Sequence, residues 1–278
     1  MPTREQIINE AIKLSETIED IDNSNLLNIW LGIYSTLLWY EPVNWVGFID
    51  LPHIIDADKL RPSTFSKKSA WKKPKIWQQR AHAVSLYLAK QLNCSIDELP
   101  LKTDLLMKQP DYIDMQRQNI LGIAFIGLVK HVLEKFGGED ISYETEVEAA
   151  TIFPGITFPG RSGTPRIDLL LKRDRIPVGI ISSKWSLRHD RLNDITNECP
   201  IYSAAYERIY RGQSQSHLRY YVVTNEFDPS RLNKILDDTC INGVVHVHKN
   251  AVINVCGLDG RISRVIDLAD FINQTSSW

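Results

Sequence analysis

The sequence predicts a chain of the α/β class with a mixed central sheet flanked by helices, preceded by a mainly helical N-terminal region. Two observations support this prediction. Before Gly138 the apolar residues recur at the spacing of amphipathic helices. After Gly138 short β-branched runs alternate with helical segments, which is typical of helices packed on a sheet.

Residues 1–118 form the predicted helical region. Thr3 and Gln6 match a capping box, in which each side chain bonds the backbone N–H of the other residue, and apolar residues continue at helical spacing to Ile18. Further helices are expected over residues 25–39 and 80–91.

The clearest helical pattern covers residues 116–136 and ends at the stop signal Gly137-Gly138. Residues 141–150 then alternate as a strand, and a loop rich in Pro and Gly follows. The remaining expected elements are strands over 166–171 and 179–184, a helix over 200–210 with Pro200 at its first position, a strand over 218–224, a helix over 229–236, and strands over 243–248 and 252–256.

Composition excludes several classes of protein. The chain has 278 residues, of which 43% are hydrophobic, too many for a disordered protein. No apolar run approaches the roughly 20 residues of a membrane span, and the first residues, MPTREQIINE, lack the apolar core of a secretory signal. The cysteines show no CxxC pair, which predicts reduced thiols in a cytoplasm and argues against a zinc site; they are Cys94, Cys199, Cys240 and Cys256.

The formal net charge of −2 hides a segregation of charge. Residues 59–96 contain no Asp or Glu, and Trp71 and Trp77 lie among the basic residues. Lysine and arginine provide the sequence-independent part of DNA affinity, so segment 59–80 is a candidate for DNA backbone contacts. A solvated basic loop is the alternative. The lysines concerned are Lys67, Lys68, Lys72, Lys73 and Lys75.

Two predicted strands carry a carboxylate and a lysine. Asp168 interrupts the apolar run RIDLLL, and Lys184 ends the next strand. With a turn centred near Ile176, Asp168 falls opposite Lys184, and Ser182 shares the face of Lys184. A buried strand carboxylate is costly unless it is paired or bound to a metal, and Mg²⁺ with a nearby lysine suits phosphodiester cleavage. An exposed strand end, or an ion pair with Arg166, is the alternative.

Further charged residues follow Lys184. Glu198 can supply a second carboxylate from a neighbouring element, or it can simply compensate the dipole at a helix start. Between Lys184 and Glu198 lies the run Arg188-His189-Asp190-Arg191. Each arginine can bond guanine O6 and N7, and the aspartate can accept from cytosine N4. A surface ion-pair cluster is the alternative.

Together these residues resemble a known family. Ser182-x-Lys184, thirteen residues and then Glu198, with Arg188-x-Asp190-Arg191 inside the gap, is similar to the type II restriction endonucleases that recognise CCGG or CCNGG. In this subgroup of the PD-(D/E)XK superfamily the second metal-binding acid has migrated to a helix, and here Ser182 occupies its usual position two residues before the lysine. The resemblance covers about residues 119–210.

The resemblance implies a PD-(D/E)XK core over residues 119–278. It implies that Asp168, Lys184 and Glu198 are catalytic with support from Ser182, that Asp168 and Glu198 bind Mg²⁺, and that Arg188, Asp190 and Arg191 read DNA bases. The implied activity is hydrolysis of double-stranded DNA at a palindromic site containing CCGG or CCNGG, in a bacterial or archaeal cytoplasm where a methyltransferase acts on the same site. A palindrome read by identical residues requires a homodimer or a higher oligomer.

Several alternatives stay open. Glu144 or Glu146, which share a strand face, can replace Asp168 as the upstream acid. The family often carries a glutamate where this chain has Ile126, in the run Gly122-Ile123-Ala124-Phe125-Ile126, so that acidic group is missing. A structure-selective repair or junction nuclease and a non-catalytic α/β DNA-binding protein are the alternative functions.

Overall fold

The computed structural model describes residues 2–3, 5–7, 9–10, 89, 93–98, 101–102, 117–159, 163, 165–184, 187, 189–212, 217–226, 228–246, 249, 252–253, 258 and 260–278. The chain divides into two compact units, residues 1–7 with 129–278 and residues 8–128. The predicted helix over 25–39, most of that over 80–91, and the basic segment 59–80 lie outside the described residues. The division of the chain after residue 118 stays a prediction. Of the described helices, none is long and apolar enough to span a membrane.

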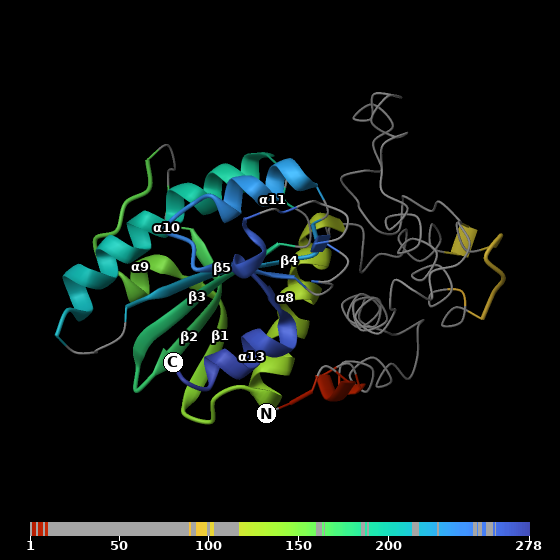
Figure 1. The fold of residues 1–278 in the computed structure, drawn as a ribbon, viewed down its shortest axis with the longest axis horizontal. Helices are drawn as coiled ribbons and strands as arrows, with labels where there is room; N and C mark the ends of the chain where they lie inside the picture. The colour runs from red at the N-terminus through yellow and green to blue at the C-terminus, as the bar shows by residue number, and fades with distance from the viewer. Residues whose placement is uncertain are drawn as a thin grey trace. The chain divides into compact units, whose positions relative to one another are not determined.

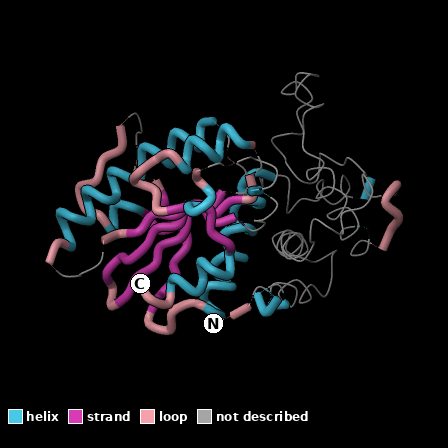
Figure 2. Tube along the Cα trace, viewed as in Figure 1, coloured by secondary structure: helices cyan, strands magenta, loops and turns pink. Residues whose placement is uncertain are grey.

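A mixed sheet of six strands forms the centre of the first unit, in the order β1-β2-β3-β4-β5-β6 (Figures 1 and 2). The first three strands are antiparallel neighbours, and the last three continue the sheet in parallel. This confirms the predicted α/β class with a mixed central sheet. The strands are β1 (Ile141–Glu148), β2 (Arg166–Arg173), β3 (Ile176–Lys184), β4 (Arg219–Thr224), β5 (Gly243–His246) and β6 (Val265–Asp267).

Helices cover both faces of the sheet (Figure 1). Neighbouring residues of β4 mark the two faces: the ring of Tyr220 stacks on Tyr202 of α10 with centroids 6.3 Å apart, whereas Tyr221 contacts Phe271 of α13 at 5.0 Å. The central strands β3 and β4 are therefore buried on both sides. The helices are α8 (Arg117–Phe136), α9 (Ala149–Ile152), α10 (His189–Tyr210), α11 (Pro229–Leu236) and α13 (Leu268–Thr275), with a 3₁₀ turn, η3, at Ile262–Arg264.

Several local predictions are confirmed. Thr3 and Gln6 form the expected capping box: the backbone N–H of Thr3 donates to Gln6 Oε1 at 2.8 Å, and that of Gln6 donates to Thr3 Oγ1 at 3.2 Å. Helix α8 ends before Gly137, where a Cβ atom would lie 2.1 Å from the hydroxyl of Tyr143, so only glycine fits. Helix α11 has the predicted bounds.

The predicted start of the helix at Pro200 is wrong. Helix α10 begins at His189, and Pro200 lies inside it. Proline lacks an N–H, so the carbonyl of Thr196 loses its intrahelical donor, yet packing of the helix on the sheet overrides this cost. Glu198 consequently lies in the middle of a helix, where it cannot compensate a helix-start dipole.

The predicted pairing of Asp168 with Lys184 is also wrong in register. The β2–β3 turn lies at Asp174-Arg175, with φ angles of 51° and 69°, and the register shifts between Leu171 and Lys172. The pairing of Leu169 with Ile181 brings Asp168 beside Ser182 instead of Lys184.

The C-terminal segment differs from its prediction too. Val252 and Ile253 are helical, so the expected strand over 252–256 is wrong at these residues. Strand β6 and helix α13 were not predicted.

The prediction of reduced thiols is wrong for two of the four cysteines. Cys199 of α10 and Cys240, which follows α11, form a disulfide with their Cα atoms 6.0 Å apart. Their sequence separation of 41 residues gives no spacing motif, because packing of α10 beside α11 brings them together. The disulfide links the middle of α10 to the segment that leads into β5.

Cys240→Ser should lower the free energy of unfolding by about 2–4 kcal/mol, since the disulfide restricts the unfolded chain. Denaturant unfolding without reductant measures the change, and Cys94→Ser, at a free cysteine, is the matched control. With excess reductant the wild type and Cys240→Ser should unfold alike. The disulfide would be contradicted if Cys199 and Cys240 were both alkylated in protein that has never been reduced.

Candidate active site

The four predicted catalytic residues and one predicted base-reading arginine meet in one cavity of about 160 Å³ on the sheet face that α10 covers. Asp168 comes from β2, Ser182 and Lys184 come from β3, and Glu198 comes from α10. The cavity is lined by Pro165, Arg166, Ile167, Asp168, Ile180, Ile181, Ser182, Lys184, Arg191, Asp194, Ile195, Glu198, Tyr202 and Tyr220. Residues far apart in the sequence thus form one polar site.

Asp168 is held by three donors from β3. Its Oδ2 atom accepts from Lys184 Nζ at 2.5 Å, from the backbone N–H of Ser183 at 2.9 Å, and from Ser182 Oγ at 3.2 Å. Only 15% of the Asp168 side chain and 22% of the Lys184 side chain are exposed. A pair this shielded from water interacts more strongly than a surface ion pair.

Helix α10 lines the other side of the cavity with one face. Its contributions recur at intervals of three or four residues, the spacing of one helix face; they are Arg191, Asp194, Ile195, Glu198 and Tyr202. Because the sequence prediction began this helix at Pro200, the pattern was missed. The full helix places the predicted second acid and one predicted base-reading arginine on the same face.

Tyr220 of β4 also lines the cavity, and it was not predicted as a site residue. Burial raises the pKa of its hydroxyl well above the ordinary value, and the nearby negative charges of Glu198 and Asp168 raise it further. Both carboxylates therefore act on the same buried phenol. The signal in the sequence was the alternation in RYYVVT, which turns Tyr220 toward one face of the sheet and Tyr221 toward the other.

The two carboxylates are suitable ligands for a hard cation. Proteins commonly hold Mg²⁺ with one or two carboxylates, and water or substrate phosphates complete its coordination. In the described part of the chain no group of three or more His, Cys, Asp or Glu side chains is arranged to hold a metal ion. Asp168 and Glu198 both line the cavity, and their carboxylate oxygens are of the ligand type that suits Mg²⁺.

Two of the predicted base-reading residues, Asp190 and Arg191, lie in the first turn of α10. Arg191 lines the cavity, its side chain is 49% exposed, and its Nη1 atom lies 3.7 Å from Asp194 Oδ2. Arg188, the side chain of Asp190, and the predicted backbone-contacting lysines Lys67, Lys68, Lys72, Lys73 and Lys75 lie outside what the structure describes.

The alternative upstream acids lie on β1, outside the cavity lining. Glu144 pairs with Lys172 at 2.7 Å. Glu146 has a φ of 54°, uncommon for a residue other than glycine, and interrupts the β1–β2 pairing where Asp168 would be its partner. Partial removal from water raises its pKa, and the negative charge of Asp168 raises it further. Asp168 is the acid in contact with Lys184.

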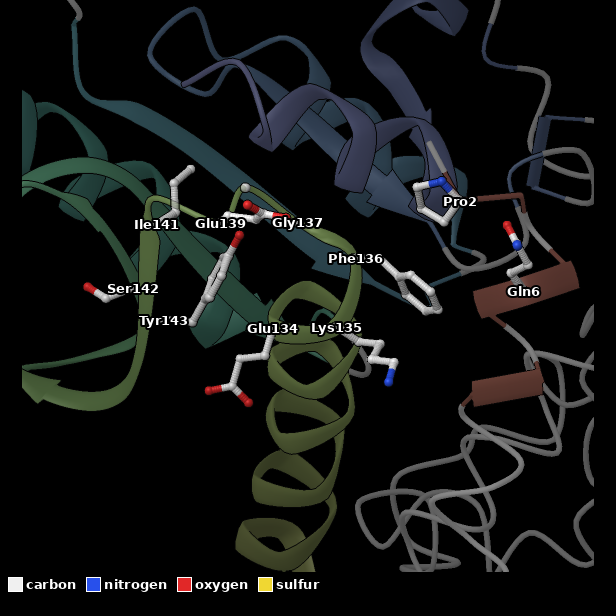
Figure 3. Close-up of a pocket in the computed structure, with 11 residues that line it drawn as sticks. Pro2, Gln6, Glu134, Lys135, Phe136, Gly137, Glu139, Ile141, Ser142 and Tyr143 are labelled. Carbon is white, nitrogen blue, oxygen red and sulfur yellow. The ribbon is translucent and has the colours of Figure 1, made fainter.

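Figure 3 shows a larger cavity, of about 630 Å³, where α8 ends and β1 begins. Glu134 and Lys135 of α8 and Tyr143 of β1 line it, together with Pro2 and Gln6 from the N-terminus. The predicted catalytic and base-reading residues that the structure describes do not line this cavity. The candidate active site is therefore the smaller cavity under α10.

Comparison with known proteins gives few matches. No family model matches the sequence, and no curated protein does. Among solved structures, the chain is similar to the type IIF restriction endonuclease Bse634I with cognate DNA, at 12% identity over 59% of this chain and 85% of that one, with a TM-score of 0.38. A second structure of the Bse634I restriction endonuclease matches over 57% of this chain and 80% of that one, again at 12% identity and a TM-score of 0.38. These values do not assign the chain to a family.

Glu146→Gln should stabilise the protein more at pH 7 than at pH 4. An acid whose pKa is raised on folding favours the folded state when protonated, and this contribution is lost as the pH rises through the folded pKa. The amide removes that unfavourable charge at neutral pH. Thermal melts at both pH values measure the difference, with Glu144→Gln as the control because Glu144 is already paired with Lys172. An equal effect of Glu146→Gln at the two pH values would contradict the interpretation.

Proposed function

We propose that this protein is a Mg²⁺-dependent type II restriction endonuclease. It hydrolyses phosphodiester bonds of double-stranded DNA at a palindromic site containing CCGG or CCNGG. The supporting observation is the contact of Lys184 with Asp168 inside a cavity that Glu198 also lines. A lysine and two carboxylates at one site are the groups that metal-dependent phosphodiester hydrolysis requires.

Each residue has a defined role in this proposal. Asp168 and Glu198 would hold the Mg²⁺ ion, which when bound lowers the pKa of water and neutralises charge on the phosphate. Lys184 stabilises the negative charge that develops on the phosphate and the attacking oxygen. Ser182 and the backbone N–H of Ser183 fix the orientation of the Asp168 carboxylate.

Recognition is assigned to the first turns of α10 and to the basic segment. Arg188, Asp190 and Arg191 would read G·C pairs in the major groove. Segment 59–80 would contact the DNA backbone through its lysines. Because both halves of a palindrome present the same bases, the protein would act as a homodimer or a higher oligomer.

Lys184→Ala should reduce cleavage of supercoiled plasmid in Mg²⁺ by about a hundredfold or more, because it removes a charge at the reacting phosphate. Lys172→Ala is a closely matched control: Lys172 lies on β2, is 16% exposed and is paired with Glu144 at 2.7 Å. That variant should retain activity. Cleavage by Lys184→Ala at the wild-type rate, or equal loss in both variants, would refute the assigned active site. A wild-type protein that binds DNA and never cuts it would point to a non-catalytic DNA-binding protein.

Arg191→Ala should lower the preference for CCGG or CCNGG duplexes by about tenfold to a hundredfold, since one bidentate contact to guanine is lost. Lys72→Ala and Lys73→Ala should instead weaken binding to all duplexes about equally and reduce the salt dependence. Filter binding in Ca²⁺ at several salt concentrations measures both effects. The assignment fails if Arg191→Ala keeps the wild-type preference.

A further inference from the structure

We infer that Glu226 is a positioning residue for DNA recognition, an inference that rests on the proposed function. Glu226 follows β4, and it is 1% exposed. Through the backbone of Leu187 it fixes the start of α10, and thereby the place from which Arg191 and its neighbours reach the DNA. Nothing in its residue type or sequence neighbourhood predicted this role.

The Glu226 carboxylate joins three segments of the chain. Its Oε2 atom accepts from the backbone N–H of Leu187 at 2.8 Å and from Arg231 Nη1 of α11 at 3.1 Å. Its Oε1 atom accepts from the backbone N–H of Asp228 at 3.0 Å. A carboxylate out of contact with water requires such donors; here one comes from the segment before α10 and two come from the start of α11.

The backbone of Glu226 is itself held in place. Its N–H donates to Thr224 Oγ1 at 3.2 Å, and its carbonyl lies 2.8 Å from His246 Nε2 of β5. Since a carbonyl only accepts, His246 Nε2 is the donor in this bond. Glu226 is therefore attached to the ends of two parallel strands, β4 and β5.

The position of Leu187 in the chain lets its bond to Glu226 set the place of the first turn of α10. It is fully buried, it follows Lys184 of β3 by three residues, and it precedes the start of α10 at His189 by two. Arg191 lies in the first turn of that helix. Helix α10 is packed on the sheet farther along, so a shift at Leu187 moves its first turn most. Base contacts need an arginine placed within hydrogen-bond distance, whereas contacts to the DNA backbone tolerate displacement.

The test compares Glu226→Gln with Asp237→Asn. Both variants convert a carboxylate paired with an arginine to an amide, but Asp237 is exposed, and its partner Arg261, whose Nε lies 2.6 Å from Asp237 Oδ1, follows β5. Binding is measured in Ca²⁺ to duplexes containing CCGG, CCNGG or a permuted sequence of the same composition. Thermal melts identify the temperature range in which each variant is folded.

Glu226→Gln should reduce the preference for the better of the two sites over the permuted duplex by about tenfold. Its affinity for the permuted duplex should stay within about twofold of wild type, because backbone contacts are unaffected. Asp237→Asn should keep both values. If Glu226→Gln does not fold, Glu226→Asp provides the same test, since it retains the charge but shortens the reach toward Leu187.

Three outcomes overturn the inference. An unchanged preference in the folded Glu226 variant shows that recognition does not depend on the contact of Glu226 with Leu187. An equal loss of affinity for all duplexes shows a general effect on binding instead of a positional one. A wild-type protein that shows no preference for CCGG or CCNGG overturns the proposed function itself and the inference with it.

Discussion

The contact of Lys184 with Asp168 is the interaction on which the candidate site depends. Three donors of β3 converge on one carboxylate oxygen of β2. The site can therefore form only in the observed register of the two strands. Slipping the pairing by one residue would turn Asp168 to the opposite face of the sheet, away from α10. The same slip would turn each apolar residue of the moved strand to the other face of the sheet, where it would meet different packing partners.

Helix α10 supplies the other half of the site, and it is fixed at two points. The Glu226 carboxylate holds Leu187, two residues before its start, and the disulfide of Cys199 holds its middle, next to Glu198. Arg191 and Glu198 are separated by two helical turns, about 10 Å along the axis. In the proposed function a single helix therefore connects base reading to metal binding. The contact of Glu226 with Leu187 and the disulfide of Cys199 then position the residues for both.

The parts of the molecule that could be predicted are those that local sequence determines. Alternation predicted β1, and short β-branched or apolar runs predicted β2 to β5. The glycine pair predicted the end of α8, and the polar positions of two strands predicted which side chains of β2 and β3 share the cavity. The errors concern the position of one hairpin turn and contacts between distant segments. Tertiary packing keeps Pro200 inside α10, a tight turn at Asp174-Arg175 with a bulge sets the β2–β3 register, and the partners of Cys199 and Glu226 lie 41 and 39 residues away. No local pattern reports such pairs.

The central claim is that the cavity under α10 cuts DNA at a defined sequence. Sequencing the ends of the fragments produced from a plasmid of known sequence, in Mg²⁺, tests this claim most directly. The account predicts a few discrete cut positions, each at the same place within a palindrome that contains CCGG or CCNGG. Ends scattered over the plasmid, or ends that follow branched or unpaired structures instead of a sequence, would contradict it.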